Sequence, residues 1–473
     1  MRLFNVALGP GIAILMLILG PMGGLPDAAW KTAALGIWMA VWWVTEAIPI
    51  PATALLPLVM LPLLGILSME AAAAPFANPV IYLFLGGFLI AAAFEKSGLH
   101  RRLALGLVAM AGTRPDRIIA GFMGAAAFLS MWVSNTATVL MLLPLATSII
   151  DRVHAADEQP GGTTGQFDIA LLLAVAYAAT IGGLGTLIGT PPNALLVGYL
   201  SSTHGIRIPF VTWMILAVPI VIIALPLAWL LLTRVIFKVR DIELPLGRGL
   251  IATERAELGG LKREEVVVAA VASLTALAWV FQPLIARVAP GITDANIGIT
   301  GALLLLAVPI NRRGTRVIDW RAAERIPWGV LVLFGGGLSL AAAIQRSGLA
   351  DWIGGSVGGL SDLPPVLLIA VITTLVLFLT ELTSNTATAA AFLPVVGSVA
   401  VGAGMSPLLL TVPAALAATC AFMLPVGTPP NAIVFGTGRL TIPQMARAGF
   451  LLNVMMVVLI TIISWLLVER VLG

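Results

Sequence analysis

The sequence Ser134-Asn135-Thr136-Ala137-Thr138 decides the fold, because it occurs a second time at residues 384–388. Flanking segments repeat at the same offset of 250 residues, namely Gly86-Gly87, Ala91-Ala92-Ala93, Ser97-Gly98-Leu99 and Pro144. A second motif, Gly-Thr-Pro-Pro-Asn-Ala, occurs at 189–194 and 427–432, an offset of 238, because the first copy has a longer loop at Asp151–Asp168. The chain is therefore internally duplicated.

The segments around these motifs are too apolar for a soluble protein. Hydrophobic residues make up 59% of the 473 residues and charged residues 10%, against about 25% charged residues in an average soluble chain. A spanning helix needs roughly 20 apolar residues. We expect eleven spans in an all-α polytopic membrane protein, at about 4–23, 28–48, 50–67, 79–95, 169–200, 210–236, 265–283, 296–310, 327–345, 406–438 and 446–468.

The two remaining apolar stretches, 117–150 and 364–399, are too long for one crossing, and each has Ser-Asn-Thr in its middle. We interpret both as re-entrant hairpins that enter and leave on one side. Irregular backbone at membrane depth is tolerated only where it is buried in protein or lines a water-filled cavity. The two polar tips are therefore expected at such a cavity.

The placement of basic residues supports this topology. With the N-terminus in the cytoplasm and the C-terminus outside, 21 of the 26 Lys and Arg residues fall on the cytoplasmic side. The five on the other side are Lys31, Arg207, Arg287, Arg346 and Arg470. Cytoplasmic loops carry the excess of Lys and Arg. Five crossings then separate the hairpins, so the second copy is inverted, as in many secondary transporters.

The tips predict an anion site. Where two half-helices meet, free backbone N–H groups and positive dipole ends face the gap, and Asn and Thr side chains add donors. The carbonyl ends and the Ser, Thr and Asn oxygens suit a sodium ion. The consecutive prolines should break each later helix at Gly189-Thr190 and Gly427-Thr428. Broken helices at matching places in two repeats indicate a transporter's binding site.

Structural readings compete with these functional ones. Ser, Thr and Asn also join helices in membranes, but two motifs repeated in register favour a site. Gly86-Gly87 and Gly335-Gly336 are expected to serve close helix packing. Glu46 is expected to cap a helix end, whereas Glu381, three residues before Ser384, is expected either to tune the second site or to hydrogen-bond the hairpin backbone. Cys420, the single cysteine, is expected on the second broken helix.

These motifs resemble the divalent anion/sodium symporters, the solute carrier 13 or INDY-type dicarboxylate transporters, over essentially the whole chain. The resemblance rests on Thr45–Ile48, both Ser-Asn-Thr tips and both Pro-Pro breaks. It implies a homodimer in the inner membrane in which a transport domain slides against a scaffold like an elevator. It further implies scaffold in residues 1–115, transport domain in 116–240, linker and scaffold in 241–360, and transport domain in 361–473.

Carried over by motif, the resemblance also implies the ligands. One sodium site would use Ser130, Ser134, Asn135 and Gly189, and a second would use Thr380, Ser384, Asn385 and Gly427. Substrate would contact Asn135, Thr136, Asn385, Thr386, Thr428 and Pro429. The expected cargo is a C4-type dicarboxylate with sodium. The expected surroundings are membrane lipid, without an organic cofactor or nucleic acid.

Other functions remain open to different degrees. An intramembrane enzyme lacks a Ser-His, Asp-Asp or His-Glu pair in its apolar segments. A channel would expose a continuous pore rather than two occluding tips. A cation–proton antiporter would need a titratable acid at the breaks, which hold Gly, Thr, Pro and Asn. A sodium-independent dicarboxylate exchanger, or a carrier of sulfate or tricarboxylates, remains the main alternative.

Overall fold

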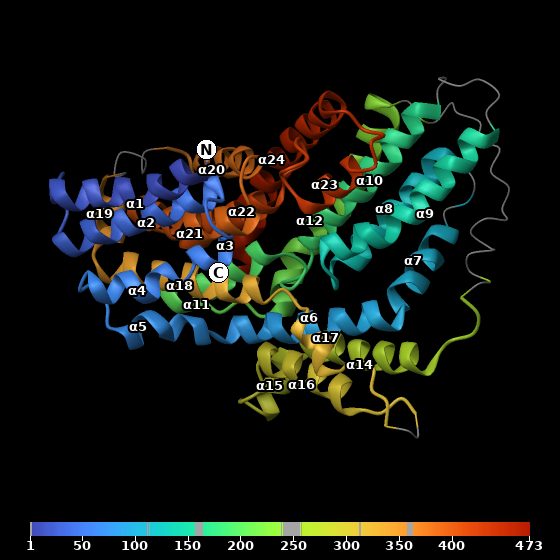
Figure 1. Cartoon of the computed structure of the whole chain (residues 1–473), viewed down its shortest axis with the longest axis horizontal. Helices are drawn as coiled ribbons and strands as arrows, with labels where there is room; N and C mark the ends of the chain where they lie inside the picture. The colour runs from blue at the N-terminus through green and yellow to red at the C-terminus, as the bar shows by residue number, and fades with distance from the viewer. Residues whose placement is uncertain are drawn as a thin grey trace.

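The computed structural model describes residues 2–110, 112, 114–156, 164–237, 239, 256, 258–311, 314–356 and 363–473. Parts of the predicted cytoplasmic loops lie outside them, including six of the counted basic residues and residues 157–163 of the loop between Asp151 and Asp168. The described residues form helices and no named strand, which confirms the all-α prediction. Figure 1 shows the helices as one bundle.

The first repeat contains these elements, in chain order: α1 (Arg2–Leu19), α2 (Asp27–Thr45), α3 (Ile50–Thr53), α4 (Leu56–Leu63), α5 (Met69–Ala73), η1 (Ala74–Ala77), α6 (Pro79–Ser97), α7 (Leu99–Ala109), α8 (Pro115–Ser130), α9 (Asn135–Ala156), α10 (Thr164–Gly183), α11 (Pro191–His204), α12 (Phe210–Leu230) and the π-helix η2 (Leu231–Ile236).

From α18 onward the second repeat follows the same order of elements as the first repeat from α6 onward, and four helices precede α18 where six elements precede α6. Its elements are α14 (Arg263–Val280), α15 (Gln282–Val288), α16 (Asp294–Ala307), α17 (Trp320–Glu324), α18 (Trp328–Arg346), α19 (Leu349–Ser356), α20 (Pro365–Thr380), α21 (Asn385–Gly402), α22 (Pro407–Thr419), α23 (Pro429–Phe435) and α24 (Ile442–Leu472).

Seven helices in the described part of the chain are long and apolar enough to cross a membrane, or eight if α14 and α15 count as one bent span. The span expected at 79–95 begins earlier, since α5, η1 and α6 form one stretch from Met69 to Ser97. The span expected at 50–67 is instead two short helices, α3 and α4. The stretch expected at 265–283 bends by 74° between α14 and α15, where Pro283 begins the new helix.

Both predicted hairpins are present as helix pairs joined by short tips. Residues 131–134 join α8 to α9, and residues 381–384 join α20 to α21. The helices within each pair contact one another, and α8 and α9 lie side by side in Figure 1. Both predicted breaks are also confirmed, since α10 and α11 are separated by 184–190 and α22 and α23 by 420–428.

The repeated glycines allow close helix packing, as expected. A Cβ atom added to Gly86 on α6 would lie 2.4 Å from the backbone carbonyl carbon of Gly298 on α16. One added to Gly336 on α18 would lie 2.1 Å from the carbonyl oxygen of Ala54. Distances this short leave no space for a methyl group. These glycines therefore fix how α6 and α18 pack in the part of the bundle that borders the site.

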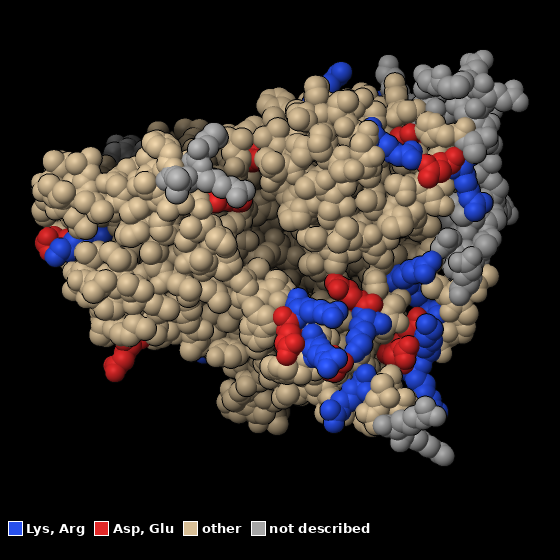
Figure 2. Space-filling view, in the orientation of Figure 1, with Lys and Arg blue, Asp and Glu red and all other residues tan. Residues whose placement is uncertain are grey.

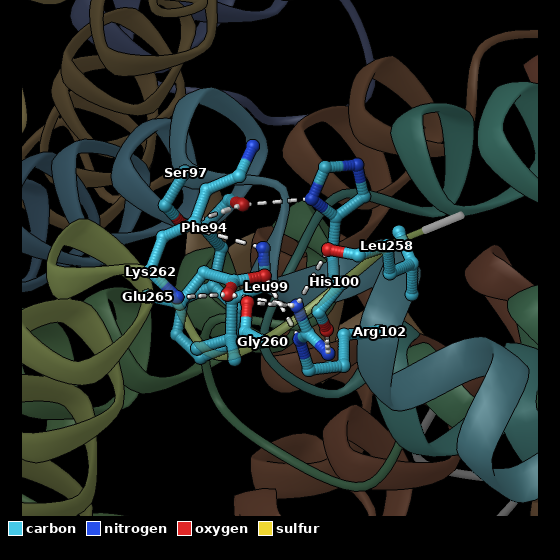
Figure 3. A network of polar contacts seen from close by, with 10 residues as sticks. Phe94, Ser97, Leu99, His100, Arg102, Leu258, Gly260, Lys262 and Glu265 are labelled. Carbon is cyan, nitrogen blue, oxygen red and sulfur yellow. Dashed lines mark hydrogen bonds and ion pairs between the residues drawn. The ribbon is translucent and has the colours of Figure 1, made fainter. Parts of the chain in front are cut away.

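The short helix α7 links α6 to the first hairpin and is anchored by Arg102 (Figure 3). The Arg102 guanidinium donates to both carboxylate oxygens of Glu265, at 3.0 and 3.1 Å, and to the carbonyls of Leu258, Gly259 and Gly260. His100 Nδ1–H donates to the Phe94 carbonyl at 2.7 Å, while burial lowers the pKa of His100. These bonds tie the start of α7 to the residues that precede and begin α14.

The second repeat anchors α19 at the matching position. Trp352 stands 250 residues after Arg102, and its indole Nε1–H donates to the Gly23 carbonyl at 3.0 Å. A left-handed glycine precedes each helix, Gly98 with φ 77° and Gly348 with φ 81°. The two helices that lead into the hairpins are therefore each held at their first turn by a different chemistry.

Candidate substrate and sodium site

A cavity of about 1060 Å³ lies where the two tips and the two breaks meet. The first repeat contributes residues 134–137 and 188–191, and the second contributes residues 384–386 and 425–430. Segments 250 residues apart in the sequence thus face one space. Figure 2 shows a hollow at the centre of this face of the molecule, with charged side chains gathered below it.

Ten of the twelve predicted site residues line this cavity: Ser134, Asn135, Thr136, Gly189, Ser384, Asn385, Thr386, Gly427, Thr428 and Pro429. The other two, Ser130 and Thr380, are fully buried at the ends of α8 and α20, directly behind the tips. The structure therefore brings the predicted residues together, with these two hydroxyls in a supporting position.

The first tip is held by hydroxyl groups. Ser130 Oγ–H donates to Asn135 Oδ1, and Thr186 Oγ1–H, from the first break, donates to the carbonyl of Met131 at 2.5 Å. A Cβ atom placed on Gly183 would lie 2.7 Å from Asn135 Oδ1 and 3.1 Å from the carbonyl oxygen of Gly189. Two predicted sodium ligands thus border one small space, which the glycine leaves open.

The second tip repeats this arrangement with different side chains. Thr380 Oγ1 is 2.9 Å from Asn385 Oδ1 and 2.9 Å from the carbonyl of Ala418 on α22. Asn385 Nδ2–H donates to the carbonyl of Thr419 at 3.1 Å. The amide of Asn385 is therefore oriented by the end of α22. Its oxygen is placed beside the second break, as that of Asn135 is placed beside the first.

The asparagine of each Gly-Thr-Pro-Pro-Asn motif braces its own break. Asn193 Nδ2 donates to carbonyls of the first break, at 2.8 Å for Thr186, and Asn431 Nδ2 donates to those of Ala421 and Leu424 at 3.1 and 3.0 Å. Both asparagines are fully buried. Neither was predicted as a site residue, although their place in the repeated motif was the available signal.

The breaks also contact one another. Thr190 Oγ1 lies 3.4 Å from Thr419 Oγ1, so the start of α11 meets the end of α22. Cys420 lies at this end of α22 and is fully buried. Cys420 was expected on the second broken helix, and it lies where α22 ends and the break of residues 420–428 begins.

Glu381 does not line the cavity. Its contacts correct one of the two roles expected for it, a hydrogen bond to the backbone of its own hairpin, while a role in tuning the second site stays a prediction. Its carboxylate accepts hydrogen bonds from the backbone N–H groups of Phe422, Met423 and Leu424 at 2.7–3.2 Å, and from Asn453 Nδ2 at 2.7 Å. It thus binds the backbone of the second break rather than that of its own hairpin. The first repeat has Met131 at this position.

The charged residues that line the cavity come from elements other than the tips and breaks. They are Glu46, Glu95, Lys96 and Arg325, from the end of α2, the end of α6 and the residue after α17. Glu46 ends α2 as predicted, with a left-handed backbone at φ 46°. Of the described residues that line the cavity, those from the tips and breaks are all uncharged. The wall that would hold an anion therefore offers amides, hydroxyls, backbone N–H groups and carbonyls.

Comparisons with solved structures show that this fold occurs in other proteins. Two solved structures share the fold over 98% of both chains: the YdaH transporter of Alcanivorax borkumensis, with a TM-score of 0.61 and 17% identity, and MtrF of Neisseria gonorrhoeae, with 0.59 and 10%.

Relatives of known name are closer in sequence. The chain is 45% identical to the sodium-dependent dicarboxylate transporter SdcS of Staphylococcus saprophyticus and 44% identical to that of Staphylococcus aureus strain USA300. Each alignment covers all of this chain and 92% of the relative. A family model of the sodium:sulfate symporter transmembrane region matches residues 5–470. The chain belongs to this family of divalent anion/sodium symporters, and it is a membrane transporter rather than an enzyme.

Proposed function

We propose that the protein is a secondary active transporter that carries C4-type dicarboxylates such as succinate together with sodium ions. The observation that supports this most strongly is the single cavity in which both tips and both breaks meet, with an uncharged, donor-rich wall. The SdcS relatives are named as sodium-dependent dicarboxylate transporters, which adds the substrate class and the coupling ion.

Charge explains why sodium is needed. An unneutralised charge is costly in apolar surroundings, and a dicarboxylate carries two. The tips and breaks that line the cavity contribute neither Lys nor Arg. They supply N–H groups and dipoles, which orient an anion but do not cancel its charge. Bound sodium ions supply the positive charge that this wall lacks.

Two sodium sites fit the two tips. The first would be formed by Ser130, Ser134, Asn135 and Gly189, and the second by Thr380, Ser384, Asn385 and Gly427. Hard cations of this kind prefer oxygen ligands, such as carbonyl and side-chain oxygens, over nitrogen and sulfur. Each tip offers a hydroxyl and an amide oxygen beside the carbonyls of a broken helix.

Substrate would lie between the tips, in contact with Asn135, Thr136, Asn385, Thr386, Thr428 and Pro429. The amide and hydroxyl donors come from both repeats, so each could serve one carboxylate of a short dicarboxylate. α9, α21 and α23 begin within or next to these segments, and helix N-termini favour anions. This arrangement favours a small molecule with a negative charge at each end.

Transport would proceed by an elevator motion in a homodimer within the lipid bilayer. Residues 116–240 and 361–473 would form the moving domain, and residues 1–115 and 241–360 the scaffold with its linker. The cavity lining includes Lys96 and Arg325, which the distribution of basic residues assigns to the cytoplasm. The conformation would then be open to the cytoplasm, with the N-terminus on that side and the C-terminus outside.

The alternatives differ in coupling and in cargo. A sodium-independent exchanger could balance charge by returning one dicarboxylate for another. The family description names sulfate, and a tricarboxylate is a larger anion of the same kind. Identical Ser-Asn-Thr tips favour a ligand with two similar ends, and the named relatives favour a dicarboxylate.

Uptake of labelled succinate into empty proteoliposomes distinguishes these functions. An inward sodium gradient should stimulate uptake relative to choline, with a sigmoidal sodium dependence and a Hill coefficient above one. Unlabelled sulfate or citrate should compete more weakly than unlabelled succinate. Uptake that ignores sodium and requires dicarboxylate inside the vesicles would show that the protein is an exchanger.

A further inference from the structure

The two halves of the site differ in charge at one pair of matching positions. In the first repeat, the tip residue Met131 meets the break through its backbone carbonyl, which accepts from Thr186 Oγ1–H. The repeat offsets relate Met131 to Glu381 and Thr186 to Leu424. In the second repeat the same two positions meet through the Glu381 carboxylate and the Leu424 N–H, at 3.2 Å. A neutral contact in one half is thus a carboxylate contact in the other.

The hydrogen-bond partners of Glu381 are those of a carboxylate. Glu381 is 3% exposed, and every group hydrogen-bonded to its oxygens is a donor: three successive backbone N–H groups and the amide of the fully buried Asn453 on α24. A protonated acid would need an acceptor, whereas a carboxylate accepts only. The hydrogen-bond geometry at the second break therefore fits a negatively charged carboxylate.

This charge lies next to the candidate residues of the second sodium site. Thr380 precedes Glu381 in the chain and contacts both Asn385 and the carbonyl of Ala418. A Cβ atom on Gly427 would lie 3.1 Å from Glu381 Oε2. At the first site the corresponding contacts of Gly189 are backbone atoms of Gly183. Of these two matching glycines, Gly427 therefore has a carboxylate among its nearest contacts and Gly189 does not.

We propose that Glu381 is a positioning residue that makes the second sodium site the tighter of the two, by holding a negative charge behind it and by fixing the 420–428 break. This inference rests on the proposed function and deepens it. Opposite charges at short range in a protein interior attract strongly enough to change affinity by an order of magnitude. The first site, with Met131, would fill at higher sodium concentration.

The variant Glu381→Gln removes the charge and nearly keeps the shape of the side chain. Sodium stabilises the folded protein by binding to it, so the melting temperature of detergent-purified protein without succinate reports sodium binding. Choline chloride at matched ionic strength is the reference. We expect Glu381→Gln to raise the sodium concentration for half-maximal stabilisation, and for half-maximal succinate uptake, by about tenfold. The KM for succinate at saturating sodium should stay within about threefold.

Asn453→Leu is the matched control, because it removes one donor to Glu381 and keeps the charge. Asn453→Leu should lower the melting temperature without changing the sodium concentration for half-maximal stabilisation. Equal shifts in both variants would overturn the proposal, since they would show a structural role only. If Glu381→Gln does not fold, Glu381→Asp tests the proposal instead, because it keeps the charge. A sodium concentration for half-maximal stabilisation like that of the unmodified protein supports the charge effect, and a higher concentration contradicts it.

The same experiment separates this inference from the proposed function. If sodium neither stabilises the unmodified protein nor drives its uptake, sodium symport is wrong and the inference fails with it. If sodium stabilises the unmodified protein and drives its uptake, but Glu381→Gln needs the same sodium concentration for half-maximal stabilisation, only the proposed role of Glu381 is wrong.

Discussion

Asn135 and Asn385 are the first helical residues after the two tips, and each is oriented by a hydroxyl five residues earlier. Each would serve a sodium ion with its amide oxygen and the substrate with its amide nitrogen. Asn385 Nδ2 also bonds the carbonyl of Thr419, which ties it to the second break. Loss of either amide should therefore remove contacts to both cargoes together.

We predict that Asn135→Ala and Asn385→Ala each lower the initial rate of succinate uptake at least about a hundredfold, since two hydrogen bonds to charged ligands are lost. Uptake into proteoliposomes measures this, and size-exclusion chromatography checks that the variants remain folded. Asn296→Ala, at the exposed start of α16, is the control and should transport normally. Normal transport by either tip variant would remove its asparagine from the site.

At this scale the sequence predicted which residues meet but not how each is held. The repeated motifs identified the tips and breaks, and all the predicted site residues that lie within these motifs line the cavity. The other two, Ser130 and Thr380, are buried behind the tips. The sequence did not predict the hydrogen-bond partners of three buried asparagines. Asn193 and Asn431 bond backbone carbonyls of the breaks, and Asn453 bonds the carboxylate of Glu381, which is far away in the sequence. Such contacts depend on how the helices pack.

Among the elements, the breaks and hairpins were predictable because Pro-Pro removes two backbone donors and Ser-Asn-Thr interrupts a long apolar stretch. Helix length was less predictable. Residues 50–67 read as one apolar span, but they form α3 and α4, because prolines at 49, 51 and 57 begin new helices. Hydropathy measures apolarity over a window and does not register where the backbone turns.

The contact between α6 and α16 gives a prediction at this scale. Gly86→Ala should lower the free energy of unfolding by about 1–3 kcal/mol, because the new methyl group would overlap the backbone of Gly298. Thermal unfolding in detergent measures the change. Gly106→Ala on α7, where nothing lies within 4 Å of the added Cβ, should be neutral or slightly stabilising. Equal stability of both variants would contradict the close packing.

The ion pair between Arg102 and Glu265, which anchors α7, gives a second prediction at the scale of the elements. Arg102→Met should lower the free energy of unfolding by about 1–3 kcal/mol, because Glu265, 3% exposed, loses its cationic partner. The double variant Arg102→Met/Glu265→Gln should recover part of the loss, since the buried charge is gone. Melting temperatures of the unmodified protein, the two single variants Arg102→Met and Glu265→Gln, and the double variant test this. A double variant as unstable as the sum of the single variants would indicate that the pair does not interact.

In the whole molecule, duplication explains why one cavity contains two sets of similar ligands. The two repeats contribute matching tips and breaks to a shared space, while the charged lining residues come from other elements. The sequence predicted this convergence from the repeat alone. It could not predict the shape of the cavity or the different chemistry of Met131 and Glu381, because identical motifs do not specify what packs behind them.

The central claim is that sodium and a dicarboxylate cross together. The most direct test measures both fluxes in the same empty proteoliposomes, with 22Na and 14C-succinate added outside. The described tip and break residues that line the cavity include no Lys or Arg, so sodium must supply the positive charge at the two predicted sites. We therefore expect sodium entry to depend on succinate, with two or more sodium ions entering per succinate. Succinate entry without accompanying sodium entry would contradict the account.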